Sequence, residues 1–128
     1  MGETIRVLVV DDNHAMAASL EDILEAKGLI VHAASSGAQA LPILHEQPAD
    51  VLLTDVKMPG MIGLELYRET RQLYPKLATI FMTAYAADEL IQQDRLEGIK
   101  AILDKPLDIQ FLLTLLSALK SVTVTLQV

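Results

Sequence analysis

Short apolar runs alternate with longer amphipathic segments along the whole chain. Five of these runs have the length of a strand, and they cover residues 5–10, 29–34, 51–54, 78–83 and 101–103. The first, third and fourth are almost continuous in aliphatic or β-branched residues instead of alternating with polar ones. That pattern is typical of parallel strands whose two faces are both covered by helices. The sequence therefore predicts a buried central sheet.

Segments with the apolar spacing of a helix follow each run, at about 15–27, 37–46, 64–74, 87–96 and 107–119. Gly28 is a C-terminal stop for the first segment. Pro42 falls inside the second, so it must stand near the first turn or kink the helix. Five repeats of strand and helix predict an α/β domain with a five-stranded parallel sheet between two layers of helices, joined by right-handed crossovers.

Composition and charge restrict the chemistry further. The 128 residues fit a single domain, and 52% hydrophobic residues with only 4% aromatic ones predict an aliphatic core. The absence of cysteine excludes a disulfide framework, a thiolate metal site and a cysteine nucleophile. A net charge of −7 argues against nucleic-acid binding by this domain, because neutralising phosphates needs clustered Lys and Arg. With no targeting segment or membrane span in the pattern, we expect a cytoplasmic protein.

Polar residues stand where four of the apolar runs end. Asp11 and Asp12 follow the first run, and Asp55 follows the third. Thr83 ends the fourth run, and Lys105 comes shortly after the fifth. Because ligands of parallel sheets bind at the carboxyl ends of the strands, we expect these side chains to converge. Three close carboxylates favour a compensating hard cation such as Mg²⁺, while a hydroxyl and an ammonium suit phosphate, so the set predicts phosphoryl transfer.

The motifs around these residues resemble the receiver domain of two-component response regulators. They are VLVVDDN at 7–13, LTDVKMPGMIGL at 53–64, MTAY at 82–85 and DKP at 104–106. The match covers about residues 4–120. The resemblance implies a flavodoxin-like three-layer fold with strand order 2-1-3-4-5. It also implies a receiver domain over 1–120, with 121–128 as a tail or the start of an interdomain linker.

The resemblance assigns Asp55 as the phosphoacceptor. In this family the phosphoryl group comes from a phosphohistidine on a sensor histidine kinase or a phosphotransfer protein. Asp11, Asp12 and Asp55 would hold Mg²⁺, Asp12 more directly than Asp11, together with the backbone carbonyl of Lys57. Such a domain is not a classical enzyme, although it assists its own phosphorylation and dephosphorylation.

The resemblance also assigns the groups that meet the phosphoryl oxygens and respond to them. Thr83, Lys105 and the backbone N–H of Ala84 would bind these oxygens. The Lys105–Pro106 peptide bond is expected to be cis, as proline permits. The added charge would draw Thr83 inward and shift the population between two packings of the face formed by helix four, strand five and helix five.

One position departs from the family pattern. Receiver domains usually carry Tyr or Phe three residues before the lysine on strand five, where this chain has Ile102. The usual aromatic rotamer switch therefore cannot operate at that position. Two alternatives stay open: Ile102 moves in a different way, or Tyr85, two residues after Thr83, carries the aromatic signal.

Several features lie outside this scheme. Phe111 and Leu115 form an i, i+4 pair away from the expected core face, which indicates a homodimer surface or a contact with helix four. Residues 121–128 alternate apolar and polar like a strand that is disordered, paired with a partner, or the start of a longer protein. The three histidines fall on different elements, so we expect no zinc site; they are His14, His32 and His45.

Two other functions compete with the receiver hypothesis. A metal-dependent phosphohydrolase with an Asp nucleophile needs a second acid shortly after it as general acid, and Lys57 occupies that place. A receiver-like module that only binds partners would not need the complete set of polar residues at the strand ends. Both alternatives are therefore weaker than a phosphorylatable receiver.

Overall fold

The computed structural model describes residues 4–56, 63–84 and 99–127. Five strands form one parallel sheet in the order β2-β1-β3-β4-β5. Four helices are described, and the fourth helix predicted near 87–96 lies outside the described residues. The strands are β1 (Arg6–Val10), β2 (Ile30–Ala34), β3 (Val51–Asp55), β4 (Ala78–Thr83) and β5 (Ile99–Asp104). The helices are α1 (His14–Ala26), α2 (Gly37–Glu46), α3 (Gly63–Leu73) and α5 (Ile109–Gln127).

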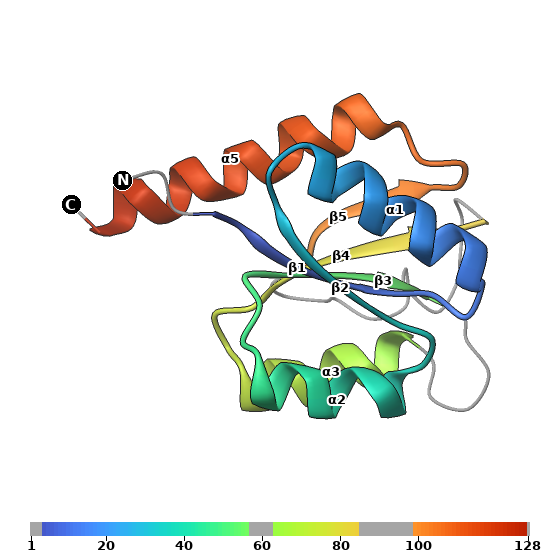
Figure 1. Cartoon of the computed structure of the whole chain (residues 1–128). Helices are drawn as coiled ribbons and strands as arrows, with labels where there is room; N and C mark the ends of the chain where they lie inside the picture. The colour runs from blue at the N-terminus through green and yellow to red at the C-terminus, as the bar shows by residue number, and fades with distance from the viewer. Residues whose placement is uncertain (1–3, 57–62, 85–98, 128) are drawn as a thin grey trace.

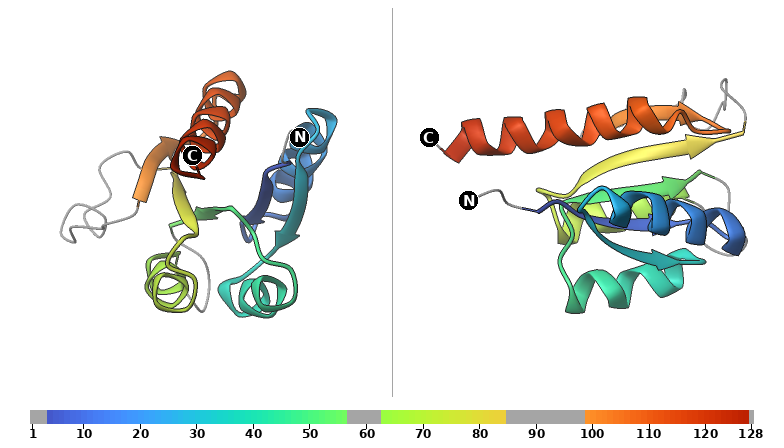
Figure 2. Two further views of the ribbon diagram at one scale, coloured as in Figure 1. Left: turned by 90° about the vertical axis from the view of Figure 1, so that its left-hand side faces the viewer. Right: turned by 45° about the horizontal axis from the view of Figure 1, so that its top comes forward.

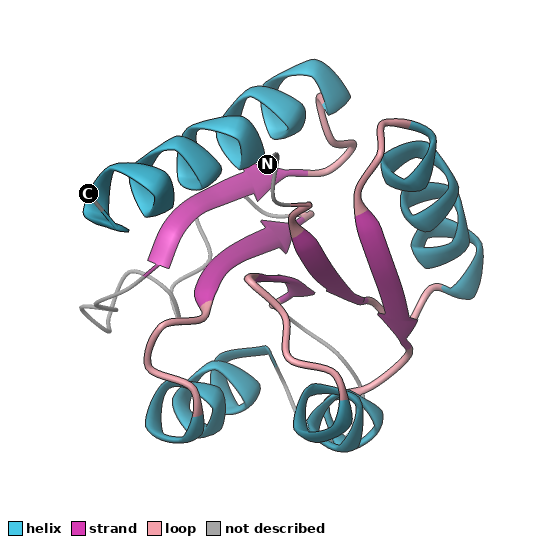
Figure 3. Cartoon of the chain, turned by 60° about the vertical axis from the view of Figure 1, so that its left-hand side comes forward, coloured by secondary structure: helices cyan, strands magenta, loops and turns pink. Residues whose placement is uncertain are grey.

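The helices cover the sheet on both sides, as Figures 1 and 3 show. Helices α1 and α5 lie on one face, and α2 and α3 lie on the other. The predicted three-layer α/β fold and its strand order are thus confirmed. In the described part of the chain, none of the helices combines the length and the hydropathy that crossing a membrane requires.

Successive side chains of the central strands point to opposite faces of the sheet, so each strand contributes to the core on both faces. Val9 and Leu53 pack with the side chains of α1 and α5. Their neighbours Val10 and Leu52 pack with those of α2 and α3. All five residues of β3 are buried, which is why its sequence reads as a continuous apolar run.

Short connections place the strand ends and the helix starts close together. The Asn13 side chain accepts a hydrogen bond from the Met16 N–H at 3.1 Å and caps α1. Gly28 has a φ of +90° just after α1, a conformation that glycine adopts readily. Pro42 stands inside α2, beyond its first turn, where it cannot donate to the carbonyl of Ala38.

The C-terminal segment differs from the sequence expectation. Helix α5 continues to Gln127, so the strand-like pattern of residues 121–128 gave a wrong prediction for 121–127. Extending an existing helix fixes one residue per new hydrogen bond, whereas an isolated strand has no partner to pair with. Figure 2 shows α5 running along the sheet and past the ends of the strands on the side where the chain begins. The proposed domain boundary at residue 120 stays a prediction.

Candidate functional site

Three carboxylates meet at the carboxyl ends of β1 and β3. Val10 pairs with Thr54 in the sheet, so Asp11 and Asp55 follow on adjacent strands. Oxygen atoms of Asp11, Asp12 and Asp55 all lie within 4.8 Å of one another. The Asp11 residue is 0% exposed and Asp55 is 9% exposed, while Asp12 is open to solvent. The cluster therefore has a buried base and an accessible front.

Lys105 joins two of these carboxylates. Its Nζ lies 2.8 Å from Asp11 Oδ2 and 2.8 Å from Asp55 Oδ2. The backbone of the same residue is anchored to β4, because its N–H donates to the Thr83 carbonyl at 2.8 Å. Burial by itself lowers the pKa of the Lys105 ammonium, but the hydrogen bonds and charges of Asp11 and Asp55 outweigh it, so the pKa is raised. The ammonium is charged and balances the buried acids.

A second contact orients Asp11. The backbone N–H of Asn13 donates to Asp11 Oδ1 at 2.9 Å, and the Asp11 N–H donates to the Ala34 carbonyl on β2 at 3.1 Å. Asn13 thus holds Asp11 and caps α1 at once. The sequence pattern singled out neither contact, although an asparagine directly before a helix is a recognisable N-cap signal.

The hydroxyl and the proline step lie at the ends of the neighbouring strands. Thr83 is the last residue of β4 and is buried, and it pairs with Asp104 on β5. Ala84 follows it and is exposed. The Lys105–Pro106 peptide bond is cis. Two further predicted residues, Lys57 and Tyr85, lie outside the described residues.

The predicted switch and dimer residues behave differently from one another. Ile102 on β5 is 43% exposed and Phe111 on α5 is 53% exposed. Leu115 instead packs against the core cluster of α1 and α5, so the expected pair does not form one exposed patch. Leu115 therefore lies on the side of α5 that packs on the core, whereas Phe111 lies on its exposed side.

The donor set of the acidic cluster fits Mg²⁺. Carboxylate oxygens are the hard ligands this ion prefers, and the exposed side of Asp12 leaves room for water or phosphate oxygens. No histidine belongs to this cluster, and among the described residues no second group of possible metal ligands gathers. The arrangement suits a weakly held, open magnesium site.

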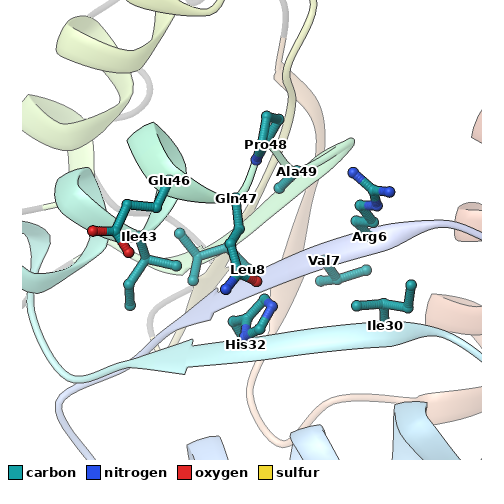
Figure 4. A pocket seen from close by; sticks show the side chains of 10 residues that line it. All are labelled: Arg6, Val7, Leu8, Ile30, His32, Ile43, Glu46, Gln47, Pro48 and Ala49. Carbon is teal, nitrogen blue, oxygen red and sulfur yellow. The ribbon is translucent and has the colours of Figure 1, made fainter.

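A cavity of about 330 Å³ lies elsewhere, between the first two strands and the C-terminal end of α2 (Figure 4). Arg6, Ile30, His32 and Glu46 are among its lining residues. Arg6 and Ile30 belong to the amino ends of β1 and β2, whereas the acidic cluster follows the carboxyl ends. None of the predicted site residues lines this cavity, so it is not the site of the expected chemistry.

Comparison with known sequences gives the same picture. Sporulation initiation phosphotransferase F of Bacillus subtilis (strain 168) is 32% identical over 104 residues, which cover 81% of this chain and 84% of that protein. A response regulator receiver protein of Anaeromyxobacter sp. (strain Fw109-5) is 40% identical over 110 residues, 86% of this chain. The chain spans only 46% of the length of the Anaeromyxobacter protein.

Solved structures are similar over nearly the full chain. A response regulator receiver domain protein from Clostridium thermocellum has a TM-score of 0.86 at 29% identity, covering 95% of this chain and 98% of its own. The response regulator TrrA from Thermotoga maritima, in complex with Mg²⁺ and BeF, has a TM-score of 0.81 at 26% identity, with coverages of 91% and 99%. A family model described as the response regulator receiver domain matches residues 7–117. The chain therefore belongs to the response regulator receiver domain family.

Proposed function

We propose that Asp55 accepts a phosphoryl group from a phosphohistidine of a sensor histidine kinase or a phosphotransfer protein. The observation that carries this proposal is the shared contact of Lys105 with Asp11 and Asp55, each at 2.8 Å, in the buried part of the acidic cluster. A carboxylate nucleophile, a fixed cation and further carboxylates are the parts that phosphoryl transfer needs.

In the proposed step, a carboxylate oxygen of Asp55 attacks the phosphorus atom and a new P–O bond forms. The P–N bond to the donor imidazole breaks, and the imidazole keeps that electron pair and takes up a proton. Lys105 provides an ammonium for the phosphoryl oxygens, with the Thr83 hydroxyl and the Ala84 N–H as expected donors. Water later attacks the same phosphorus atom, the P–O bond to Asp55 breaks, and inorganic phosphate leaves with the carboxylate restored. The domain thus assists both its phosphorylation and its dephosphorylation.

Asp11, Asp12 and Asp55 would hold Mg²⁺, with the Lys57 carbonyl as an expected further ligand. When bound, the ion supplies positive charge that offsets the repulsion between Asp55 and the phosphoryl oxygens. The Asp11 carboxylate is held in a fixed orientation, because Oδ1 accepts a hydrogen bond from the Asn13 N–H and Oδ2 accepts one from Lys105.

Phosphorylation would act on the face formed by helix four, β5 and α5. Thr83 ends β4 and directly precedes the segment expected to form helix four, so its movement toward the phosphoryl group would reposition that segment. Ile102 is 43% exposed on β5 and has no ring to rotate inward. The two alternatives for the signal, a movement of Ile102 or of Tyr85, both remain part of the proposal.

The experiment that tests the proposed function uses a small labelled acyl phosphate as donor. Wild-type protein with Mg²⁺ should incorporate label, and Asp55→Asn should not. Asp50→Asn is a matched control, because this exposed acid lies at the opposite end of the sheet, where it accepts from the Arg6 N–H. Failure of the wild type to incorporate label, or equal labelling of Asp55→Asn, would reject Asp55 as phosphoacceptor.

The proposal includes a homodimer through the helix four, β5 and α5 face, with the cytoplasm as the expected location. Phe111 is the strongest candidate contact, because more than half of its surface is exposed. Sedimentation with and without a beryllofluoride mimic should show association that Phe111→Glu removes. Leu73→Glu, at an exposed leucine on α3, serves as control. If Phe111→Glu sediments like wild type in both states, this dimer does not form.

A further inference from the structure

Thr54, the residue before Asp55, carries a hydroxyl in an apolar place. Thr54 is 0% exposed. Its partners in the sheet are Val10 on β1 and Phe81 on β4, both fully buried. A buried hydroxyl costs free energy unless it is hydrogen-bonded, and valine has nearly the same shape without that requirement. The hydroxyl therefore calls for an explanation beyond packing.

The hydroxyl donates to the backbone carbonyl of Asp55, with an Oγ1 to O distance of 3.0 Å. That carbonyl belongs to the peptide unit between Asp55 and Val56. The N–H of the same peptide unit donates to the Met82 carbonyl on β4 at 3.0 Å. Both polar atoms of this one peptide are thus held, one by a side chain and the other by the neighbouring strand.

We propose that Thr54 is a positioning residue for phosphoryl transfer, an inference that rests on the proposed function of Asp55. Fixing this peptide plane fixes the backbone torsion that follows the Asp55 Cα atom. It also sets the direction in which the chain leaves Asp55, which is both the proposed phosphoacceptor and a proposed metal ligand. Thr54 touches neither the metal nor the phosphoryl group and acts through the Asp55 backbone.

Thr54→Val removes the hydroxyl and keeps the shape. The loss of one net hydrogen bond at the reacting residue corresponds to a slowing of about fivefold in phosphorylation by an acyl phosphate. Two readouts are independent of that rate. The Val56 amide should exchange its hydrogen faster, and Mg²⁺ should bind the unphosphorylated protein more weakly, also by about fivefold.

Thr70→Val is the matched control. Thr70 is also a buried threonine whose hydroxyl donates to a carbonyl, that of Tyr67 at 3.1 Å, but it lies within α3. The Thr70→Val protein should become phosphorylated at the wild-type rate. Thr54→Ser, which keeps the hydroxyl, should regain most of the wild-type rate. If Thr54→Val does not fold, Thr54→Ser and Thr54→Ala carry the same test, since both lose the methyl group and only alanine loses the hydroxyl.

A Thr54→Val protein with wild-type phosphorylation, Mg²⁺ affinity and Val56 exchange would overturn the inference. So would equal slowing in Thr54→Val and Thr70→Val, because that result shows a general effect of losing a buried hydroxyl. A wild-type protein that takes no phosphoryl group would instead reject the proposed function, and the Val56 exchange would still show whether Thr54 holds this peptide.

Discussion

The two ends of the sheet have opposite characters. At the carboxyl ends of the strands, Lys105 bridges Asp11 and Asp55, and these groups are largely withdrawn from water. At the amino ends lies a cavity of about 330 Å³ whose charged residues, Arg6 and Glu46, are exposed. Among the described residues, the linked set of charged groups lies at the carboxyl ends and not around this cavity.

The two ends differ in what they offer a reaction: one has a cavity, and the other has charged groups in contact. Phosphoryl transfer needs charges held at fixed distances in partly buried surroundings, where they interact more strongly than in water. The acidic cluster supplies that arrangement, because Lys105 lies 2.8 Å from both Asp11 and Asp55 at the partly buried carboxyl ends of the strands. Cavity volume is therefore a poor guide to chemistry here, because the acidic cluster and Lys105 do not line the cavity.

The largest effect is expected for Lys105→Met. Removing a positioned charge from the phosphoryl site should slow phosphorylation by about 100-fold or more. Lys100→Met, at an exposed position on β5, is the control and should react like wild type. The rates with an acyl phosphate and Mg²⁺ compare the two variants. Equal rates for Lys105→Met and Lys100→Met would show that the bridge between the acids has no part in the reaction.

Asp12→Asn should weaken Mg²⁺ binding at the carboxyl end of the sheet. Changes even in the outer shell of metal sites cost about 10- to 100-fold in affinity, so loss of a direct ligand should cost at least as much. Titration of the unphosphorylated protein measures it. Glu46→Gln changes an exposed acid at the amino end and should bind Mg²⁺ normally; a similar loss there would mean that net charge, not the cluster, attracts the ion.

Alkaline pH should remove a stabilising contribution that Lys105→Met lacks. Burial lowers the pKa of Lys105, but Asp11 and Asp55 outweigh it and raise the pKa in the folded state. The contribution is therefore complete below the ordinary lysine pKa of about 10.4 and is lost as pH rises through the raised value. Urea unfolding across that range should show the stability difference between wild type and variant falling. A constant difference would contradict the assigned contacts.

The smallest effect is expected at the amino end. Ile30→Ser changes an exposed residue beside the cavity, and exposed sites usually alter stability by about 0.5 kcal/mol or less. Phosphorylation should stay at the wild-type rate, measured in the same assay. A clear loss of rate would show that the two ends of the sheet are coupled, and would contradict the view that the amino end has no part in phosphorylation.

The fold followed closely from the sequence where strands are buried on both faces. The bounds of β4 agree with its apolar run, because every residue of that strand after Ala78 is buried. The edge strand β5 is longer than its run, since it begins at Ile99 and includes the exposed Lys100, which interrupts the apolar pattern. In the tail, β-branched alternation indicated a strand, but propensity of this kind is weak and the continuing helix overrides it.

The position of the site could be predicted from the sequence, but its hydrogen bonds and ion pairs could not. Parallel strands bring their carboxyl ends to one side of the sheet. The strand order implied by the family resemblance then predicts that Asp11 and Asp55 are neighbours, and the β1–β3 pairing agrees. No sequence pattern states that Lys105 reaches both acids, because that depends on how the chain turns after β5. The bond from Thr54 to the Asp55 carbonyl is equally invisible in sequence, where a threonine in a strand is ordinary.

The most direct test of the central claim is to locate the modified residue. The protein is treated with Mg²⁺ and an acyl phosphate, the acyl phosphate on the protein is reduced with borohydride to leave a stable mark, and the peptides are sequenced by mass spectrometry. We expect a mark on Asp55, absent when Mg²⁺ is withheld and absent in Asp55→Asn. A mark on Asp11 or Asp12, or on no residue of the acidic cluster, would contradict this expectation.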